Sequence, residues 1–304
     1  MVMPFDYKHL ATMRSRALGS ASDFMFLRRA AQSRLLDRLY DVRRSFADML
    51  EIGSFDGSLA AGLLAMSPAK HQENYKLYQV DIDQRMAKFA SDQAIFKSVF
   101  NAELPQFQED QAAPQYDLIF SSLFFQWVND LPGLLSQCRQ SLRPDGLLIA
   151  NFFGGRTLQE LRTCLTHAET EISGGAYPRC IPMVDVKGAG ALLQRAGFAL
   201  PVSDSDLLKV TYASLNDLMI DLRKMGETNA LSARCKRFSS RALFARAAEL
   251  YQDNFADDNG QLVASFELVT ITAWAPDASQ QKPLRPGSAN HSLAAAVMPD
   301  KNGN

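Results

Sequence analysis

The chain lacks the features that mark several classes of protein. It has four cysteines and four histidines in 304 residues, and neither CxxC nor HxxxH spacing occurs, so no metal site is predicted. Its longest apolar runs have the length of a strand, well below the ~18 residues that a membrane-spanning helix needs. Residues 1–10 contain no apolar segment of the kind found in secretory signals. We therefore expect no integral membrane segment.

Neither sign of charge is in excess. Lys plus Arg number 32 and Asp plus Glu number 33, so the net charge of -1 gives no reason to expect nucleic acid as a partner. An arginine-rich stretch, Arg14 to Arg38, is interpreted mainly as a solvated helix face, with a cleavable organelle-targeting segment as the alternative. Scattered cysteines fit a reducing compartment. That compartment would be the bacterial cytoplasm or, in a eukaryote, the mitochondrial matrix.

Three zones follow one another along the chain. Residues 1–44 have helical periodicity, with apolar side chains such as Leu27, Ala31 and Leu35 at spacings of three and four. Residues 45–275 form the predicted main domain, in which the helices of 213–255 are expected to form a cap. Residues 276–304 are rich in Pro, Gly, Ser, Asn and Ala and are predicted to be a mobile tail.

Short apolar runs alternate with helical patterns through the main domain. Strands are predicted at 49–52, 77–80, 98–100, 116–120, 147–153, 207–212 and 265–274. Helices are predicted at 59–66, 84–96, 131–142, 185–196, 214–224 and 241–252, with a turn at 143–146. This alternation indicates an α/β fold, an open and mostly parallel sheet with helices on both faces. Ligands bind such sheets at the carboxyl ends of the strands.

The segment after the first predicted strand carries the strongest local signal. It reads Glu51-Ile-Gly53-Ser-Phe55-Asp-Gly57, a GxxxG pattern that opens a helix. Glycines there let the backbone approach a ligand, and the helix N-terminus offers free N–H groups. A simple strand-to-helix turn is the alternative interpretation.

Two further segments follow strand ends. Asp81 ends the second strand, where a carboxylate can accept both ribose hydroxyls of a nucleoside; a helix cap is the alternative, which Asp83 serves better. After the fourth strand, residues 121–132 (Ser-Ser-Leu-Phe-Phe-Gln-Trp-Val-Asn-Asp-Leu-Pro) would meet the substrate, although Trp127 also suits the core.

Together these segments resemble the motifs of class I S-adenosylmethionine-dependent methyltransferases. The resemblance implies a Rossmann-like fold with a seven-stranded sheet and S-adenosyl-L-methionine as the cofactor. The residues that it implies for cofactor binding are Glu51, Gly53, Ser54, Phe55, Gly57, Asp81, Ile82, Asn101, Ala102 and Ser121. Two positions depart from the pattern: Phe55 replaces the middle glycine, and Asn101 stands where an aspartate is common.

A narrower resemblance covers nearly the whole chain. Residues 124–132, 153–162, 168–171, 195–198, 225–229 and 266–274 are similar to the mitochondrial complex I assembly factor 5 family and its bacterial relatives. That family resembles malonyl-carrier-protein O-methyltransferases of biotin synthesis, and its mitochondrial member is regarded as an arginine hydroxylase acting on a core subunit of respiratory complex I. Gln126 stands where many relatives have a histidine, and an amide cannot serve as a general base.

The substrate side is predicted from few residues, and no catalytic residue is assigned. The candidates are Gln126, Trp127, Glu169, Glu171, Glu227 and Asn229. Glu169 and Glu171 could hold a guanidinium through paired hydrogen bonds, or simply form a solvated face. Thr157 and Glu160 have capping-box spacing, so Glu160 is interpreted as structural. No 2-His-1-carboxylate iron set for oxygen chemistry is visible in the sequence.

Three functions remain open from the sequence. The first is an S-adenosylmethionine-binding enzyme that hydroxylates or methylates a protein arginine, with a complex I subunit as the partner. The second is an O-methyltransferase acting on a small or carrier-bound carboxylate. Basic residues in the predicted cap would then receive an acidic carrier: Arg223, Lys224, Arg234, Lys236, Arg237 and Arg241. The third is a non-catalytic assembly chaperone.

Overall fold

The computed structural model describes residues 3–19, 22–66, 71–89, 94–98, 116–281 and 288. The strands are β1 (Phe46–Ile52), β2 (His71–Asp81), β3 (Ala94–Ser98), β4 (Tyr116–Ser122), β5 (Leu142–Phe153), β6 (Ala199–Tyr212) and β7 (Leu262–Trp274). The α-helices are α1 (Tyr7–Ala17), α2 (Phe26–Asp41), α3 (Ser58–Ala65), α4 (Leu131–Ser141), α5 (Gln159–Ser173), α6 (Val186–Arg195), α7 (Leu215–Met225) and α8 (Arg241–Phe255). Short 3-10 helices span Ser22–Met25, Gln84–Phe89 and Phe125–Trp127.

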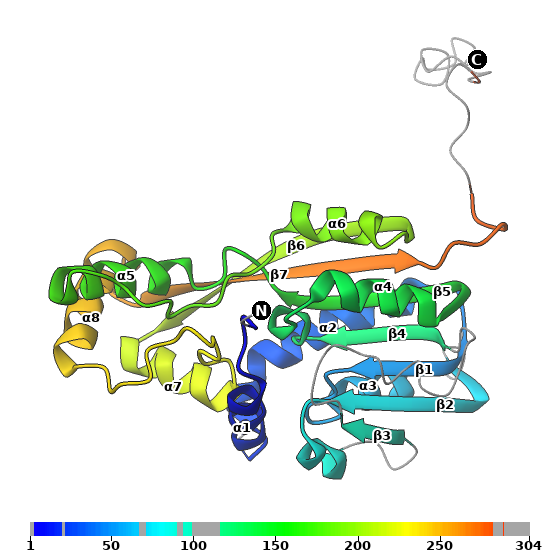
Figure 1. The fold of residues 1–304 in the computed structure, drawn as a ribbon, viewed down its shortest axis with the longest axis horizontal. Helices are drawn as coiled ribbons and strands as arrows, with labels where there is room; N and C mark the ends of the chain where they lie inside the picture. Colours follow the sequence, from blue (N-terminus) through cyan, green and yellow to red (C-terminus); the bar gives the residue numbers. More distant parts are fainter. Residues whose placement is uncertain are drawn as a thin grey trace, which may run out of the picture.

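All seven strands form one sheet in the order β3-β2-β1-β4-β5-β7-β6 (Figure 1). The first five are parallel neighbours, and β7 runs antiparallel between β5 and β6. The order reverses at β1 and β4, which both neighbour one another and end at the same edge. The predicted α/β class and mostly parallel sheet are confirmed, and this reversal is where such sheets bind ligands.

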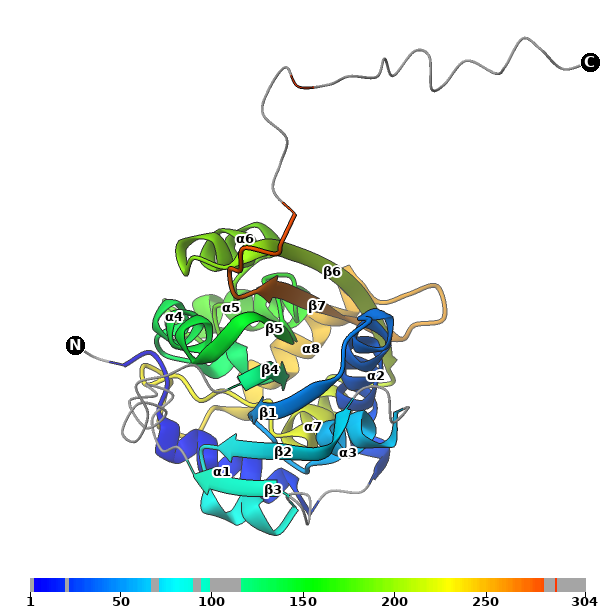
Figure 2. The same cartoon turned by 90° about the vertical axis from the view of Figure 1, so that its right-hand side faces the viewer.

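Helices cover both faces of the sheet (Figure 2). On one face, α4 and α6 bury Leu134, Leu135 and Leu193 in a core with β5 and β7. On the other face, α2 and α3 bury Leu35 and Leu59 against β1 and β4. Burial on both faces explains why the central strands are runs of apolar residues rather than alternating patterns.

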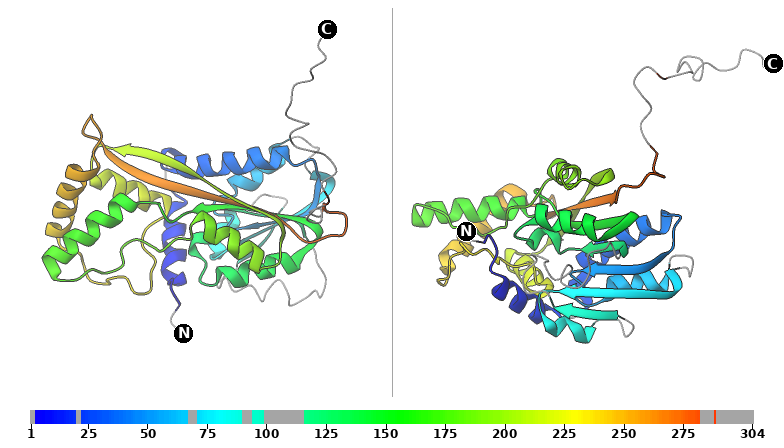
Figure 3. Two further views of the ribbon diagram at one scale, coloured as in Figure 1. Left: turned by 90° about the horizontal axis from the view of Figure 1, so that it is seen from above. Right: turned by 45° about the vertical axis from the view of Figure 1, so that its right-hand side comes forward.

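A second group of helices packs at the far end of the long strands β6 and β7 (Figure 3). Helices α5, α7 and α8 share a core with β7 that includes Leu161, Leu218, Ala247 and Phe266. Helices α7 and α8 fall within 213–255, the segment predicted as a cap, and α5 lies beside α8. This arrangement places a helical layer next to the edge where the parallel strands end.

The helix and the strand predicted between residues 84 and 100 are wrong in their bounds. The helix expected at 84–96 is a 3-10 helix that ends at Phe89, and Ala94–Ser98 is strand β3. β3 pairs with β2 from Leu77↔Ala94 to Asp81↔Ser98, so hydrogen bonding to the sheet edge overrides the local helical pattern. Of the strand predicted at 98–100, only residue 98 lies within the described residues.

Residues 143–146, the predicted turn, form the irregular start of β5. Helix α4 does end before them, but Leu142 already pairs with Tyr116 and the register then shifts. Asp145 has φ 59°, and the backbone of Gly146 accepts a hydrogen bond from Ala275. Pairing with neighbouring backbone therefore keeps a turn-like sequence within a strand.

The capping box predicted at Thr157–Glu160 is also wrong. Leu158, not Thr157, precedes α5 as its cap residue. The Thr157 hydroxyl donates to the Glu267 carbonyl, and buried Glu160 accepts hydrogen bonds from the Ser265 backbone N–H and hydroxyl. Both side chains instead form hydrogen bonds that hold the start of α5 against β7. Glu160 is therefore structural, through these bonds and not through a helix cap.

The predicted tail, 276–304, is described only at 276–281 and 288. Across the residues that the structure describes, no helix combines the length and the apolar character needed to cross a membrane.

Candidate cofactor and substrate site

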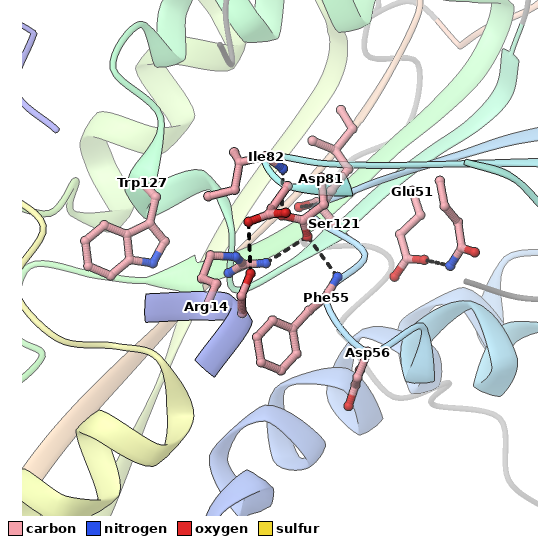
Figure 4. Close-up of polar contacts among 12 residues, drawn as sticks. Arg14, Glu51, Phe55, Asp56, Asp81, Ile82, Ser121 and Trp127 are labelled. Carbon is pink, nitrogen blue, oxygen red and sulfur yellow. Dashed lines mark hydrogen bonds and ion pairs between the residues drawn. The ribbon is translucent and has the colours of Figure 1, made fainter. Parts of the chain in front are cut away.

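The loop after β1 turns sharply at the carboxyl edge of the sheet (Figure 4). Gly53 and Gly57 have φ of 79° and 72°, a region that favours glycine. A Cβ added to Gly53 would lie 2.3 Å from the Phe124 ring, so the absent side chain is what lets Phe124 pack there. The Gly53 and Ser54 N–H groups donate to the Val80 carbonyl, which fixes the loop against β2.

Asp81, at the end of β2, is the centre of this site. Its Oδ2 accepts hydrogen bonds from the Phe55 N–H at 2.9 Å and from Arg14 Nη2 at 3.0 Å. Its Oδ1 accepts from the Ile82 N–H at 2.7 Å. Phe55 is buried and has φ 51°, so the residue in the place of the middle glycine does adopt a left-handed conformation.

Glu51 and Ser121 stabilise the strand ends behind the loop. Glu51 Oε2 accepts from Gln79 Nε2 at 2.6 Å, and burial raises the pKa of the Glu51 carboxyl to about 8. Ser121 is buried and donates to the Ile52 carbonyl at 2.6 Å, which joins β4 to β1. Asn101 and Ala102, the other predicted cofactor residues, lie outside the described residues.

Two arginines at the site were interpreted wrongly as part of a solvated helix face. Arg14 of α1 is 0% exposed and Arg28 of α2 is 3% exposed. Their guanidinium carbons lie 5.0 and 4.0 Å from the centre of the Phe55 ring. A helix-face pattern does not identify them, because the packing of α1 and α2 in the fold turns these positions inward. Their position next to apolar residues such as Met13 and Leu27 was the only available signal.

A cavity of about 240 Å³ opens beside this edge, between β5, α5 and α7. Its walls are mostly apolar, and they include Trp127, Phe153, Leu161, Met219 and Phe244. The polar side chains of Arg179, Arg223, Glu227, Thr228 and Asn229 also line it. A cavity of this kind fits the aliphatic stem of a side chain with a polar end.

Glu227 is the buried carboxylate of this cavity. Its Oε2 accepts hydrogen bonds from Trp127 Nε1 at 3.1 Å and Gln126 Nε2 at 3.2 Å. Its Oε1 lies 3.6 Å from Arg28 Nη2 and has no hydrogen-bond donor among the described residues. Burial raises the pKa of Glu227, although Arg28 and Arg14 oppose that effect. The structure thus brings together three of the predicted substrate-side residues.

The other predicted substrate-side residues lie further out. Asn229 lines the cavity and donates to the Pro178 carbonyl at 2.8 Å. Glu169 forms a paired contact with Arg179, which lowers the pKa of the Glu169 carboxyl, so it reaches the cavity only through that arginine. Glu171 pairs with Arg246 on an exposed face of α5 and α8 and does not join the group.

Within the described ranges, no group of three or more His, Cys, Asp and Glu side chains is arranged to hold a metal ion.

Comparisons with known proteins agree with this fold. The family described as "Methyltransferase domain" matches residues 50–148, which begin within β1 and contain β2 and β4 with the Gly53 loop and Asp81. A crystal structure of a putative methyltransferase from Bacillus halodurans superimposes with a TM-score of 0.54 at 13% identity, over 82% of this chain and all of that one. This likeness shows that the chain has the fold of the class I methyltransferases.

Curated relatives define the family more narrowly. "Arginine-hydroxylase NDUFAF5, mitochondrial" of Danio rerio is 35% identical over 91% of this chain and 84% of its own length. The Homo sapiens protein of the same name is 35% identical over 89% of this chain and 76% of its own. A "Malonyl-[acyl-carrier protein] O-methyltransferase" of Xylella fastidiosa is 33% identical, over 90% and 89%. The chain belongs to the NDUFAF5 family, and the malonyl-carrier-protein enzymes are further relatives.

Proposed function

We propose that this chain binds S-adenosylmethionine at the carboxyl ends of β1 and β2 and uses the adjoining cavity to modify an arginine side chain of a protein. The arginine-hydroxylase relatives support the substrate class. The observation that carries the proposal is the carboxylate of Glu227, whose side chain is 6% exposed and which stands in the wall of an otherwise mostly apolar cavity. The protein substrate would be a subunit of respiratory complex I.

The residues at the strand ends fit this cofactor. Asp81 presents a carboxylate suited to ribose hydroxyls, beside a loop whose glycine permits close approach. Buried donor atoms of Arg14 and Arg28 have no acceptor among the described residues, and a zwitterionic ligand would supply one. Bound S-adenosylmethionine carries a methyl group already activated on sulfur, so for methyl transfer the chain would chiefly align the substrate and exclude water.

Glu227 would recognise the guanidinium. A carboxylate accepts two parallel hydrogen bonds from arginine, and aromatic walls such as Trp127 and Phe153 suit its planar cation. Hydrogen bonds from Trp127 and Gln126 hold Glu227 in place. Gln126 thus positions a carboxylate, a task that an amide can perform although it cannot accept a proton as a base.

A second candidate is methylation of a carrier-bound carboxylate, as in the name of the Xylella fastidiosa relative. Arg223 favours it, because this cation lines the same cavity and could pair with a carboxylate. Glu227 disfavours it, because a buried carboxylate repels another.

Calorimetry on the full chain saturated with S-adenosylhomocysteine, the demethylated cofactor, separates the two. We expect a peptide of the candidate subunit that contains arginine to bind, and the same peptide with lysine or citrulline in place of arginine to bind at least tenfold more weakly. Equal binding of all three peptides, or binding of a malonyl carrier protein alone, would contradict the arginine proposal. The four cysteines are free, and we also propose a compartment with reduced thiols, the mitochondrial matrix or the bacterial cytoplasm.

A further inference from the structure

Two cations are buried side by side over the loop that follows β1. Arg14 comes from α1 and Arg28 from α2, and both guanidinium groups lie over the ring of Phe55. Burying a charged group costs several kcal/mol in free energy unless partners satisfy it. The partners of these two side chains therefore show what the site is built for.

The hydrogen bonds of the two arginines are incomplete. Arg14 uses Nη2 on Asp81, while its buried Nε and Nη1 have no acceptor within the described part of the chain. The buried Nε of Arg28 likewise has none there, and its contact with Glu227 is long, at 3.6 Å. Burial, and then the charge of Arg14, lower the pKa of Arg28.

The carboxylates already present do not fill this gap. Asp81 also accepts from the Phe55 and Ile82 N–H groups, and Asp56 accepts from the Ser58 N–H and hydroxyl. Glu227 uses Oε2 for Trp127 and Gln126, and its Oε1 lies 3.6 Å from Arg28 Nη2, beyond hydrogen-bond distance. Charge is close to balance, but three buried N–H donors still lack acceptors. Because unsatisfied buried guanidinium N–H groups are unfavourable, an anionic oxygen ligand would stabilise this site.

We infer that Arg28 and Arg14 form a carboxylate-binding site whose occupant is the carboxylate at the amino-acid end of S-adenosylmethionine. The inference rests on the proposed function. It assigns binding residues to the amino-acid end of the cofactor, opposite to the ribose. A cavity of about 240 Å³, lined by Arg28, Phe55 and Asp56 among others, opens on the α2 side of the loop and provides room there. Asp81 does not line this cavity, and its carboxylate is left for the ribose.

Cofactor entry then requires Arg14 to move. Its Nη2 now occupies Oδ2 of Asp81, one of the two oxygens that ribose hydroxyls would use. The carboxylate of the incoming cofactor offers Arg14 a replacement acceptor at the same moment. Arg28 has an unpartnered buried Nε within the described part of the chain, and its nearest carboxylate contact is long, at 3.6 Å, so it can bind the cofactor carboxylate without such an exchange.

Two ligands that differ only at the amino-acid end test the inference. S-adenosylhomocysteine carries the carboxylate, and 5′-methylthioadenosine has the same adenosine without it. Titration calorimetry would compare both ligands on the full wild-type chain, on Arg28→Met and on Arg28→Lys. Arg34→Met is the matched control, because Arg34 lies on the same helix but is half-exposed and pairs with Asp206. Circular dichroism would confirm that each variant is folded.

We expect Arg28→Met to weaken S-adenosylhomocysteine at least tenfold while the Kd of methylthioadenosine changes less than twofold. Arg28→Lys should recover part of the loss, and Arg34→Met should change neither ligand. Equal weakening of both ligands, or of neither, would overturn the carboxylate assignment while leaving cofactor binding intact. Free malonate tests for a carboxylate from another source. If malonate raises the Tm of the wild type but not of Arg28→Met, while both adenosine ligands bind every variant equally, then Arg28 binds a carboxylate other than that of the cofactor and the assignment is wrong. Failure of the wild type to bind either adenosine ligand would overturn the proposed function as well.

Discussion

Arg14 Nη2 lies 3.0 Å from Oδ2 of Asp81, and both side chains are buried. The first helix of the chain therefore reaches the carboxylate at the end of the second strand. The same helix contacts the segment that carries Glu227: the Thr228 hydroxyl lies 2.7 Å from the Met13 sulfur, and Gly226 packs against the Arg14 backbone. Helix α1 thus connects the proposed cofactor site with the proposed substrate cavity.

Replacement of Asp81 should abolish tight cofactor binding. We expect Asp81→Asn to raise the Kd of S-adenosylhomocysteine at least tenfold, about 1.4 kcal/mol, because the amide cannot accept both ribose hydroxyls. Calorimetry measures the change, and Asp83→Asn, at a neighbouring carboxylate whose side chain is 12% exposed, is the control. An unchanged affinity would place the ribose elsewhere. A non-catalytic chaperone should keep its partner binding in the Asp81 variant, whereas an enzyme loses activity.

Glu51 should make the stability of the fold depend on pH. Burial raises its carboxyl pKa from 4.5 to about 8, so between these values the folded chain holds a proton that the unfolded chain has released. This contribution is complete below pH 4.5 and is lost as pH rises towards 8, by up to about 1.4 kcal/mol per pH unit. Denaturant unfolding from pH 5 to 8 on wild type and Glu51→Gln measures it. Glu51→Gln should lose less stability than the wild type over that range, while Glu249→Gln, at an exposed carboxylate, should match the wild type. If the free energy of unfolding depends on pH in the same way in all three proteins, the assignment to Glu51 is refuted.

Glu227 should control substrate binding but not cofactor binding. We expect Glu227→Gln to weaken the arginine peptide at least tenfold and to change the S-adenosylhomocysteine Kd much less, with exposed Glu171→Gln as the control. The raised pKa of Glu227 adds a pH signature, since the carboxylate loses its charge as pH falls through that pKa. Peptide affinity should therefore decline on acidification in the wild type and stay flat in Glu227→Gln. A variant that keeps the wild-type peptide affinity would remove Glu227 from the site.

Glu160 should matter for stability alone. Glu160→Ala leaves the buried N–H and hydroxyl of Ser265 without their acceptor, which should cost about 2 kcal/mol or more in the free energy of unfolding. Thermal or urea unfolding measures the loss. The affinity for S-adenosylhomocysteine at a temperature where the variant is folded should equal that of the wild type, and a lower affinity would show that Glu160 belongs to the binding site.

Much of the fold could be predicted from the sequence because its elements are local. Apolar runs such as Leu147–Phe153 identify strands that are buried on both faces, and the Gly53 loop and Asp81 follow strand ends directly. Errors arose where tertiary pairing decides, as at Ala94–Ser98, which the edge of β2 holds as a strand.

The site could be predicted only where its residues follow the strands. The burial of Arg14 and Arg28 could not be predicted, because it depends on how α1 and α2 pack in the fold and not on the helical pattern of their own sequences. The sequence predicts that the segment with Gln126 and Trp127 lies near the substrate. It does not predict their hydrogen bonds to Glu227, because these residues are about 100 positions apart and periodicity describes only local structure.

Mass spectrometry tests the central claim most directly. Arginine-containing peptides of the candidate complex I subunit would be compared between cells that hold this chain and cells from which its gene is deleted, with the Asp81→Asn variant returned as a control. We expect an arginine that is heavier by one oxygen or by one methylene only when the wild-type chain is present. Identical peptide masses in all three samples would contradict arginine modification of that subunit.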